Sequence, residues 1–155
     1  MTGEEDTIVT VDFIDAKDLA SEMYRLAYGH GACHVGLCIG DAYLYPTATG
    51  RLKIRPSGVI YHHFHVVQSI SLLGRATSSN WIEQFVGRKI DSEFYRLLTE
   101  PIYVLKDTGL KVKVPKREIC VDIIADALKA IGIYTTSRTP NAFFKELQVH
   151  THRIG

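Results

Sequence analysis

Two residues of this chain, a late cysteine and an early histidine, have the settings expected of a nucleophile and a general base. Apolar residues recur at helical spacing after Cys120, and Gly132 ends the pattern. A cysteine in the first turn of a helix meets the positive end of the helix dipole and unpaired backbone N–H groups, which favour the thiolate over the thiol. We therefore predict a helix that begins at Cys120, with Cys120 as a candidate nucleophile. The structural alternative is a small apolar residue that starts a buried helix.

His34 is the candidate base because it opens a predicted strand over residues 34–39. Strand alternation places Gly36 on the same face, where the missing side chain leaves room for a second group. An imidazolium beside the thiolate would stabilise it, and the backbone N–H of Cys120 would form part of an oxyanion hole. The structural alternative is a histidine at a strand edge whose ring binds a backbone carbonyl.

A basic run leads into the predicted helix. Residues 110–117 alternate apolar and basic side chains, which is typical of a strand with one solvated face. Positive charge delivered next to Cys120 would further favour its thiolate. The run could also bind phosphate or an anionic polymer, although such residues are usually just solvated. Its basic residues are Lys111, Lys113, Lys116 and Arg117.

Composition limits the class of protein. The 155 residues, 46% of them hydrophobic, suffice for one cored domain, so we predict a single domain over residues 1–155 with residues 1–6 disordered. A formal net charge of +1 gives no case for a nucleic-acid partner. Three cysteines do not make a disulfide framework and fit free thiols in a reducing compartment. The oligomeric state stays open.

The residue pattern predicts no signal peptide or membrane span. The acidic N-terminus lacks the basic and apolar regions of a signal peptide, and no later apolar run reaches membrane-spanning length. We therefore expect no membrane span. The expected location is the cytoplasm, or a destination reached without a signal peptide, for example by way of a phage or a secretion system.

Patterning along the chain alternates between strand and helix. We predict strands over residues 7–14, 34–39, 42–47, 52–55, 61–71, 102–105 and 110–117. We predict helices after Asp15, over 78–87, over 92–98 closed by Pro101, from Cys120, and from Pro140 behind the N-cap Thr139. Together these elements predict an α+β domain whose small antiparallel sheet packs on the helix that starts at Cys120.

Two segments resemble circularly permuted papain-like hydrolases, the YiiX-like and NlpC-related group. Residues 18–29 and 32–41, with the run Ala32-Cys33-His34-Val35-Gly36, are similar to the family's helix ending in glycine and its His-Val-Gly strand. Ile119-Cys120-Val121 resembles the start of the later helix that carries the nucleophile, and Thr139-Pro140 resembles the opening of the last helix. The resemblance implies a papain-like fold in permuted order, with Cys120 as nucleophile and His34 as base.

The third catalytic residue departs from the family pattern. Members usually carry a glutamate or another polar residue on the strand after His-Val-Gly, where it orients the imidazole. Residues 43–50 of this chain contain no carboxylate. Thr47 is the nearest polar match and Tyr45 shares its strand parity, so either would orient His34 by a hydrogen bond.

The resemblance also implies a reaction. The Cys120 thiolate would attack an amide or ester carbonyl and form an acyl-enzyme, with no cofactor. Substrates of the family resemble peptidoglycan stem peptides or lipid-linked amides and esters, so we expect a cysteine amidase or peptidase. One alternative is a thiol acyltransferase or lipid esterase similar to lecithin:retinol acyltransferase. Another is a binding or structural module that kept the fold and lost the chemistry.

A histidine run at His62, His63 and His65 is the one pattern that suggests metal. His63 and His65 share a strand face, and neutral imidazoles bind zinc well. A closed site needs further ligands, and His150 and His152 lie in a polar tail that we expect to be mobile. We therefore predict no metal site.

Overall fold

The computed structural model describes residues 5–16, 22, 26, 34–40, 42–46, 52–56, 64–78 and 80–154. Its strands are β1 (Glu5–Ala16), β2 (His34–Ile39), β3 (Ala42–Pro46), β4 (Leu52–Pro56) and β5 (Phe64–Ala76). Its helical elements with defined bounds are the 3₁₀ helix η2 (Trp81–Phe85) and the α-helices α2 (Glu93–Asp107), α3 (Cys120–Ala130) and α4 (Pro140–Gln148). The chain is therefore an α+β protein, as predicted.

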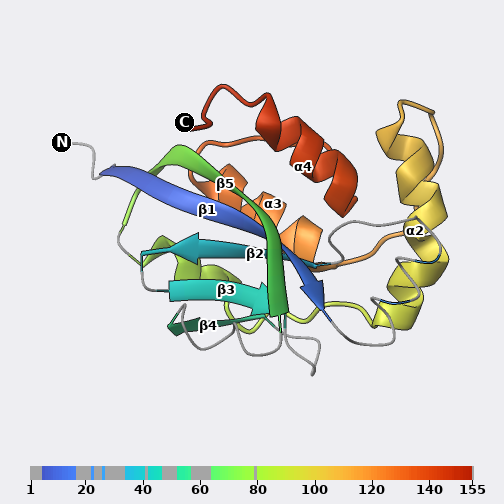
Figure 1. The fold of residues 1–155 in the computed structure, drawn as a ribbon, viewed down its shortest axis with the longest axis horizontal. Coiled ribbons are helices and arrows are strands. Elements are labelled where there is room, and N and C mark those ends of the chain that lie inside the picture. Colours follow the sequence, from blue (N-terminus) through green and yellow to red (C-terminus); the bar gives the residue numbers. More distant parts are fainter. Residues whose placement is uncertain are drawn as a thin grey trace.

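The strands form one antiparallel sheet in the order β4-β3-β2-β1-β5 (Figure 1). Period-two alternation of β-branched and polar residues predicted β1, and the turn at Gly40 predicted the β2–β3 hairpin. Both are confirmed, since Gly40 takes a positive φ of 55° and Cys38 pairs with Tyr43 across the turn. β1 begins at Glu5, so the last two residues of the segment expected to be disordered belong to a strand.

The sheet has two different faces, because successive side chains of a strand point to opposite sides. We call the first the helix face, since its residues join the main core with α3 and α4. We call the second the far face. The helix face carries Val9, Val11, Phe13, Val35, Leu37 and Leu44. The far face carries a smaller buried cluster of Ile14, Tyr43 and Tyr45, with Cys38 packed against it.

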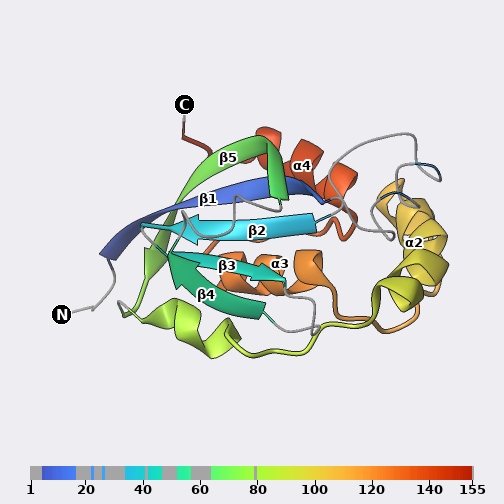
Figure 2. The same cartoon turned by 60° about the horizontal axis from the view of Figure 1, so that its bottom comes forward.

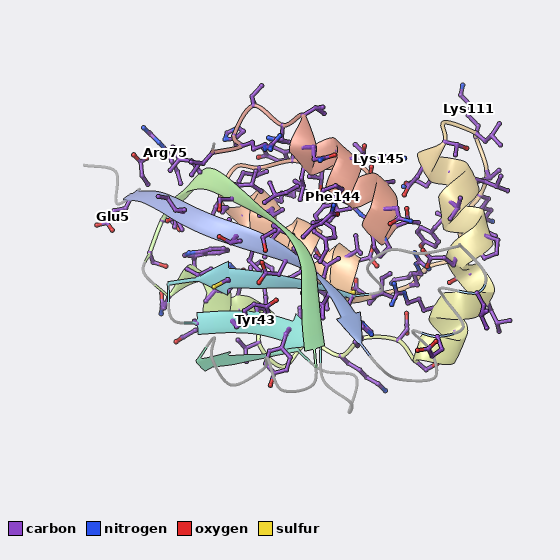
Figure 3. All side chains as sticks on the ribbon, viewed as in Figure 1. Glu5, Tyr43, Arg75, Lys111, Phe144 and Lys145 are labelled. Carbon is purple, nitrogen blue, oxygen red and sulfur yellow. The ribbon has the colours of Figure 1, made fainter. Side chains whose placement is uncertain are left out.

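Two helices cover the helix face. α3 buries Val121, Ile124 and Leu128 in the main core, at the spacing that predicted the helix. α4 packs on β1 through Phe144, whose ring meets that of Phe13 edge-on at a centroid separation of 5.1 Å (Figure 3). α4 begins at Pro140 behind the N-cap Thr139, as predicted.

α2 lies at the end of the sheet where β2 and α3 begin (Figure 2). The prediction that Pro101 closes a helix over 92–98 and precedes a strand over 102–105 is wrong, because α2 runs through Pro101 to Asp107. Proline removes one hydrogen bond from a helix interior. Contacts of Arg96, Glu100 and Tyr103 with Arg117 tie residues before and after Pro101 to the same partner.

The predicted strand over residues 110–117 is also absent from the structure. This segment has no strand pairing and runs along α2 instead. The hydroxyl of Tyr95 donates to the carbonyl of Lys116 at 2.9 Å, and that of Tyr103 donates to the carbonyl of Pro115. Side-chain bonds from a helix therefore replace the ladder that the alternation suggested.

The C-terminal segment, which we expected to be mobile, is docked on the edge of β5. The N–H of Leu73 donates to the carbonyl of His152 at 2.9 Å, and the N–H of Ile154 donates to the carbonyl of Ser71 at 2.8 Å. None of the helices in the part of the chain that the structure describes is long and apolar enough to cross a membrane.

Candidate functional site

Cys120 is the first residue of α3, as the sequence predicted. The preceding Ile119 has extended backbone angles and begins the helix by accepting the N–H of Ile123 at 3.3 Å. Ile119 has no acceptor in its side chain, so it does not cap the first turn in the way that serine or aspartate does. The first-turn N–H groups beside Cys120 are therefore not capped by the residue before it, which suits an oxyanion site.

The Cys120 thiol is free and only 2% of the residue is exposed. It belongs to the main core, together with Val35 and Leu37 of β2. A substrate therefore needs local access at the start of α3.

His34 is the first residue of β2 and is 6% exposed. Its Cα pairs with that of Ile14, a residue of the far face. Directly paired residues of antiparallel strands share a face, so the His34 side chain starts from the far face and Val35 from the helix face.

The structure brings the two elements together at one end. β2 and α3 pack against each other and both begin at the end of the sheet nearest α2 (Figure 2). Because His34 and Cys120 are the first residues of these elements, contact between them requires the imidazole to reach around the end of the sheet. This differs from our expectation that Gly36 leaves room for the pair.

The space over Gly36 is occupied by Tyr43. A Cβ built on Gly36 would lie 2.5 Å from Cε1 of Tyr43 and 2.6 Å from its hydroxyl oxygen. Tyr43 extends from β3 across β2 on the far face and is fully buried (Figure 3). Residue 36 must therefore be glycine, because any side chain there would clash with the ring of Tyr43.

The two candidates for the orienting residue have different outcomes. Tyr45 is buried on the far face, the face from which His34 starts, and its ring centroid lies 6.0 Å from that of Tyr43. Thr47 lies outside the described residues, as do His62 and His63 of the histidine run and most of the helix predicted after Asp15. Of that helix, Leu26 is helical and exposed.

Sequence reasoning missed Asp12 as a site residue. It lies on β1 opposite Gly36, on the face of the strand away from Val11 and Phe13, and is 4% exposed. Ser69 Oγ donates to Asp12 Oδ1 at 2.6 Å. Burial raises the pKa of Asp12, and hydrogen bonds from Ser69 and Tyr43 oppose that rise. The signal available in the sequence was an acidic residue directly between two apolar residues, Val11 and Phe13, of a predicted strand.

The basic run before Cys120 divides into two kinds of residue. Lys111, Lys113 and Lys116 are exposed, as expected for a solvated face. Arg117 is buried, and its Nη1 lies 3.0 Å from Glu100 Oε2. Its charge is therefore paired with that of Glu100, and its side chain does not belong to the solvated face that the alternation predicted.

Arg117 joins three segments at the start of α3. Its Nη1 donates to Thr99 Oγ1 at 3.1 Å, its Nη2 donates to the carbonyl of Arg138 at 3.1 Å, and its guanidinium stacks on the Tyr103 ring at 3.7 Å. Burial raises the pKa of Glu100, and the charges of Arg96 and Arg117 oppose that rise. The segment that leads into Cys120 is thus anchored to α2 and to the loop before α4.

Asp122 fixes the first turn of α3 from within the helix. Its Oδ2 accepts the N–H of Ile119 at 2.9 Å, and its Oδ1 lies 3.6 Å from Nε of Arg138. Burial raises the pKa of Asp122 to about 6, against the lowering effects of the Ile119 N–H and of Arg117 and Arg138. A carboxyl with a pKa of about 6 therefore lies two residues from Cys120.

No family model, curated protein or solved structure matches this chain.

Proposed function

We propose that the protein is a cysteine amidase or peptidase of the papain-like type, with Cys120 as nucleophile and His34 as general base. The observation that carries the proposal is that Cys120 opens α3, His34 opens β2, and the two elements pack together and begin at the same end. A thiol at a helix start and an imidazole at the neighbouring strand start are the parts that cysteine acyl transfer requires.

The reaction follows from these parts. His34 takes the proton of the Cys120 thiol, and the sulfur attacks the substrate carbonyl carbon while first-turn N–H groups, including that of Cys120, hold the oxyanion. The carbon–nitrogen bond then breaks, and His34 gives its proton to the leaving amine. Water attacks the resulting thioester, His34 accepts a proton from it, and the acid leaves with the Cys120 sulfur free again. Stem peptides of peptidoglycan fit this chemistry as substrates.

A specific observation favours a second candidate, a module that keeps the fold without the chemistry. Cys120 is almost fully buried in the main core, and His34 starts from the far face of the sheet. An inert scaffold would have both features. A transferase of acyl groups, by contrast, would use the same pair with an acceptor other than water.

Cysteine labelling separates an enzyme from an inert module. Iodoacetamide is added below stoichiometry at pH 7, and the modified peptides of Cys120, Cys38 and Cys33 are quantified by mass spectrometry. We expect Cys120 to react fastest although it is more buried than Cys38, and His34→Ala to remove this advantage. Cys38, a partly exposed thiol whose Sγ lies 3.7 Å from the carbonyl of Gly40, is the internal control.

If Cys120 is labelled no faster than Cys38, Cys120 is not an activated nucleophile. Product analysis then separates the enzymatic alternatives, with muropeptides and acyl esters offered together. Release of free acid and amine supports the amidase. Transfer of the acyl group to an added amine or alcohol supports the transferase.

A further inference from the structure

Asp12 is a buried carboxylate on the face of the sheet from which His34 starts. In the β1–β2 ladder Asp12 pairs with Gly36, and Ile14 pairs with His34. Asp12 is therefore the diagonal cross-strand neighbour of His34. Diagonal neighbours have Cα atoms about 7–8 Å apart, a separation that aromatic side chains still span.

The Asp12 carboxylate is held in place from two sides. Ser69 of β5 donates a hydrogen bond of 2.6 Å to its Oδ1. Tyr43 of β3 crosses β2 above Gly36 and hydrogen-bonds to Asp12. A Cβ built on Gly36 would lie within 2.8 Å of three Tyr43 atoms, namely two ring carbons and the hydroxyl oxygen. Two strands, β5 and β3, thus supply the side-chain contacts of the Asp12 carboxylate.

We propose that Asp12 is a positioning residue for His34, a role that rests on the proposed function of Cys120 and His34. A negative charge diagonally across the strands from His34 favours the imidazolium that forms when Cys120 loses its proton, and a hydrogen bond to it would fix the ring orientation. Because the carboxylate is 4% exposed, salt and water screen this effect only weakly. Asp12 would thereby do the work that we had assigned to Thr47 or Tyr45.

The described strands carry no second buried carboxylate on this face. On the far face of β2 and β3 the described titratable residues besides His34 are Cys38, Tyr43 and Tyr45. Asp6 has the same parity on β1, but it is exposed and pairs with Arg75 at 3.4 Å near the opposite end of the strand. Among the described residues of β1, β2 and β3, Asp12 is thus the buried carboxylate of this face.

The test is a pH titration of the His34 ring by NMR in the wild type, in Asp12→Asn and in Asp6→Asn. Asparagine keeps the shape of the side chain and removes its charge. We expect the His34 midpoint to fall by about one pH unit in Asp12→Asn and to stay unchanged in Asp6→Asn. Labelling of Cys120 at pH 7 should slow about tenfold in the first variant alone.

If Asp12→Asn folds and the midpoint of the His34 titration is unchanged, the inference is overturned. Such a result would mean that Asp12 supports only the stability of the fold and does not affect the charge of His34. If Asp12→Asn does not fold, the wild-type titration decides: a His34 midpoint at or below about 6.5, the ordinary value for histidine, overturns the inference. Failure of the proposed function is detected by a different measurement. It fails if Cys120 of the wild type is labelled no faster than Cys38, and the titration of His34 does not depend on that labelling.

Discussion

The ring of Tyr43 lies directly over Gly36, with Cε1 of the tyrosine 2.5 Å from the position that a Cβ at residue 36 would occupy. Real side chains essentially never approach so closely, so the glycine and the tyrosine require each other. This relationship joins β2 to β3 and delivers the tyrosine to the Asp12 carboxylate on β1. It therefore organises the far face from which His34 starts.

Gly36→Ala should destabilise the protein by about 1–3 kcal/mol, because the added methyl group must displace a fully buried ring. Urea unfolding measures the effect. The matched control is the same substitution in a Tyr43→Ala background, where the methyl group meets no ring and should cost much less. An equal loss in both backgrounds would mean that the close approach does not set the stability of this face.

The sequence was most informative where burial follows a local period. β2 and the start of α3 lie where alternation and helical spacing placed them, because the apolar residues of these patterns are the ones that pack in the main core. The same signal failed for residues 110–117, where alternating basic residues run along α2 without a strand partner. A local pattern indicates which side chains are buried. It does not indicate whether a neighbouring strand or a helix packs against them.

The candidate site was predictable only in part, for the same reason. Cys120 and His34 are recognisable because their local settings, a helix start and a strand start, carry the chemical argument. Asp12 is not recognisable in this way, because its burial depends on Ser69 and Tyr43, which are distant in sequence. Arg117 was misjudged because its partner Glu100 lies behind a proline that local rules treat as a helix end.

Glu100→Gln should destabilise the protein by about 3 kcal/mol, because it leaves the buried Arg117 guanidinium without its counter-charge. Glu118→Gln is the control, since Glu118 forms a comparably short ion pair with Arg88, at 2.7 Å, in which both side chains are partly exposed. That change should cost less than about 1 kcal/mol. Chemical unfolding of both variants makes the comparison, and similar losses would show that burial of the Glu100 pair adds nothing.

Asp122 should make stability fall as pH rises from about 4 to about 6. Its pKa is raised from 3.8 to about 6 in the folded state, so the folded protein binds a proton more tightly than the unfolded chain does. Between these values the native state holds more protons, and deprotonation therefore disfavours folding by up to about 3 kcal/mol. Unfolding at several pH values in the wild type and in Asp122→Asn measures this. The difference between the two proteins should change across that window and stay constant above about pH 7, and a constant difference throughout would contradict the raised pKa.

Asp107, the last residue of α2, should be needed to start α4. Its carboxylate accepts the N–H of Arg138 at 3.0 Å, and the N–H and hydroxyl of Thr139 at 2.9 and 2.8 Å, so the cap of α4 comes from another helix. Asp107→Ala should therefore cost about 1–2 kcal/mol and increase amide exchange in the first turn of α4. The control is Asp126→Ala, which removes one partly exposed partner of Arg88 and should change neither the exchange of α4 nor the stability by more than about 1 kcal/mol. Unchanged exchange at the start of α4 in Asp107→Ala would show that Pro140 and the packing of Phe143 suffice to begin the helix.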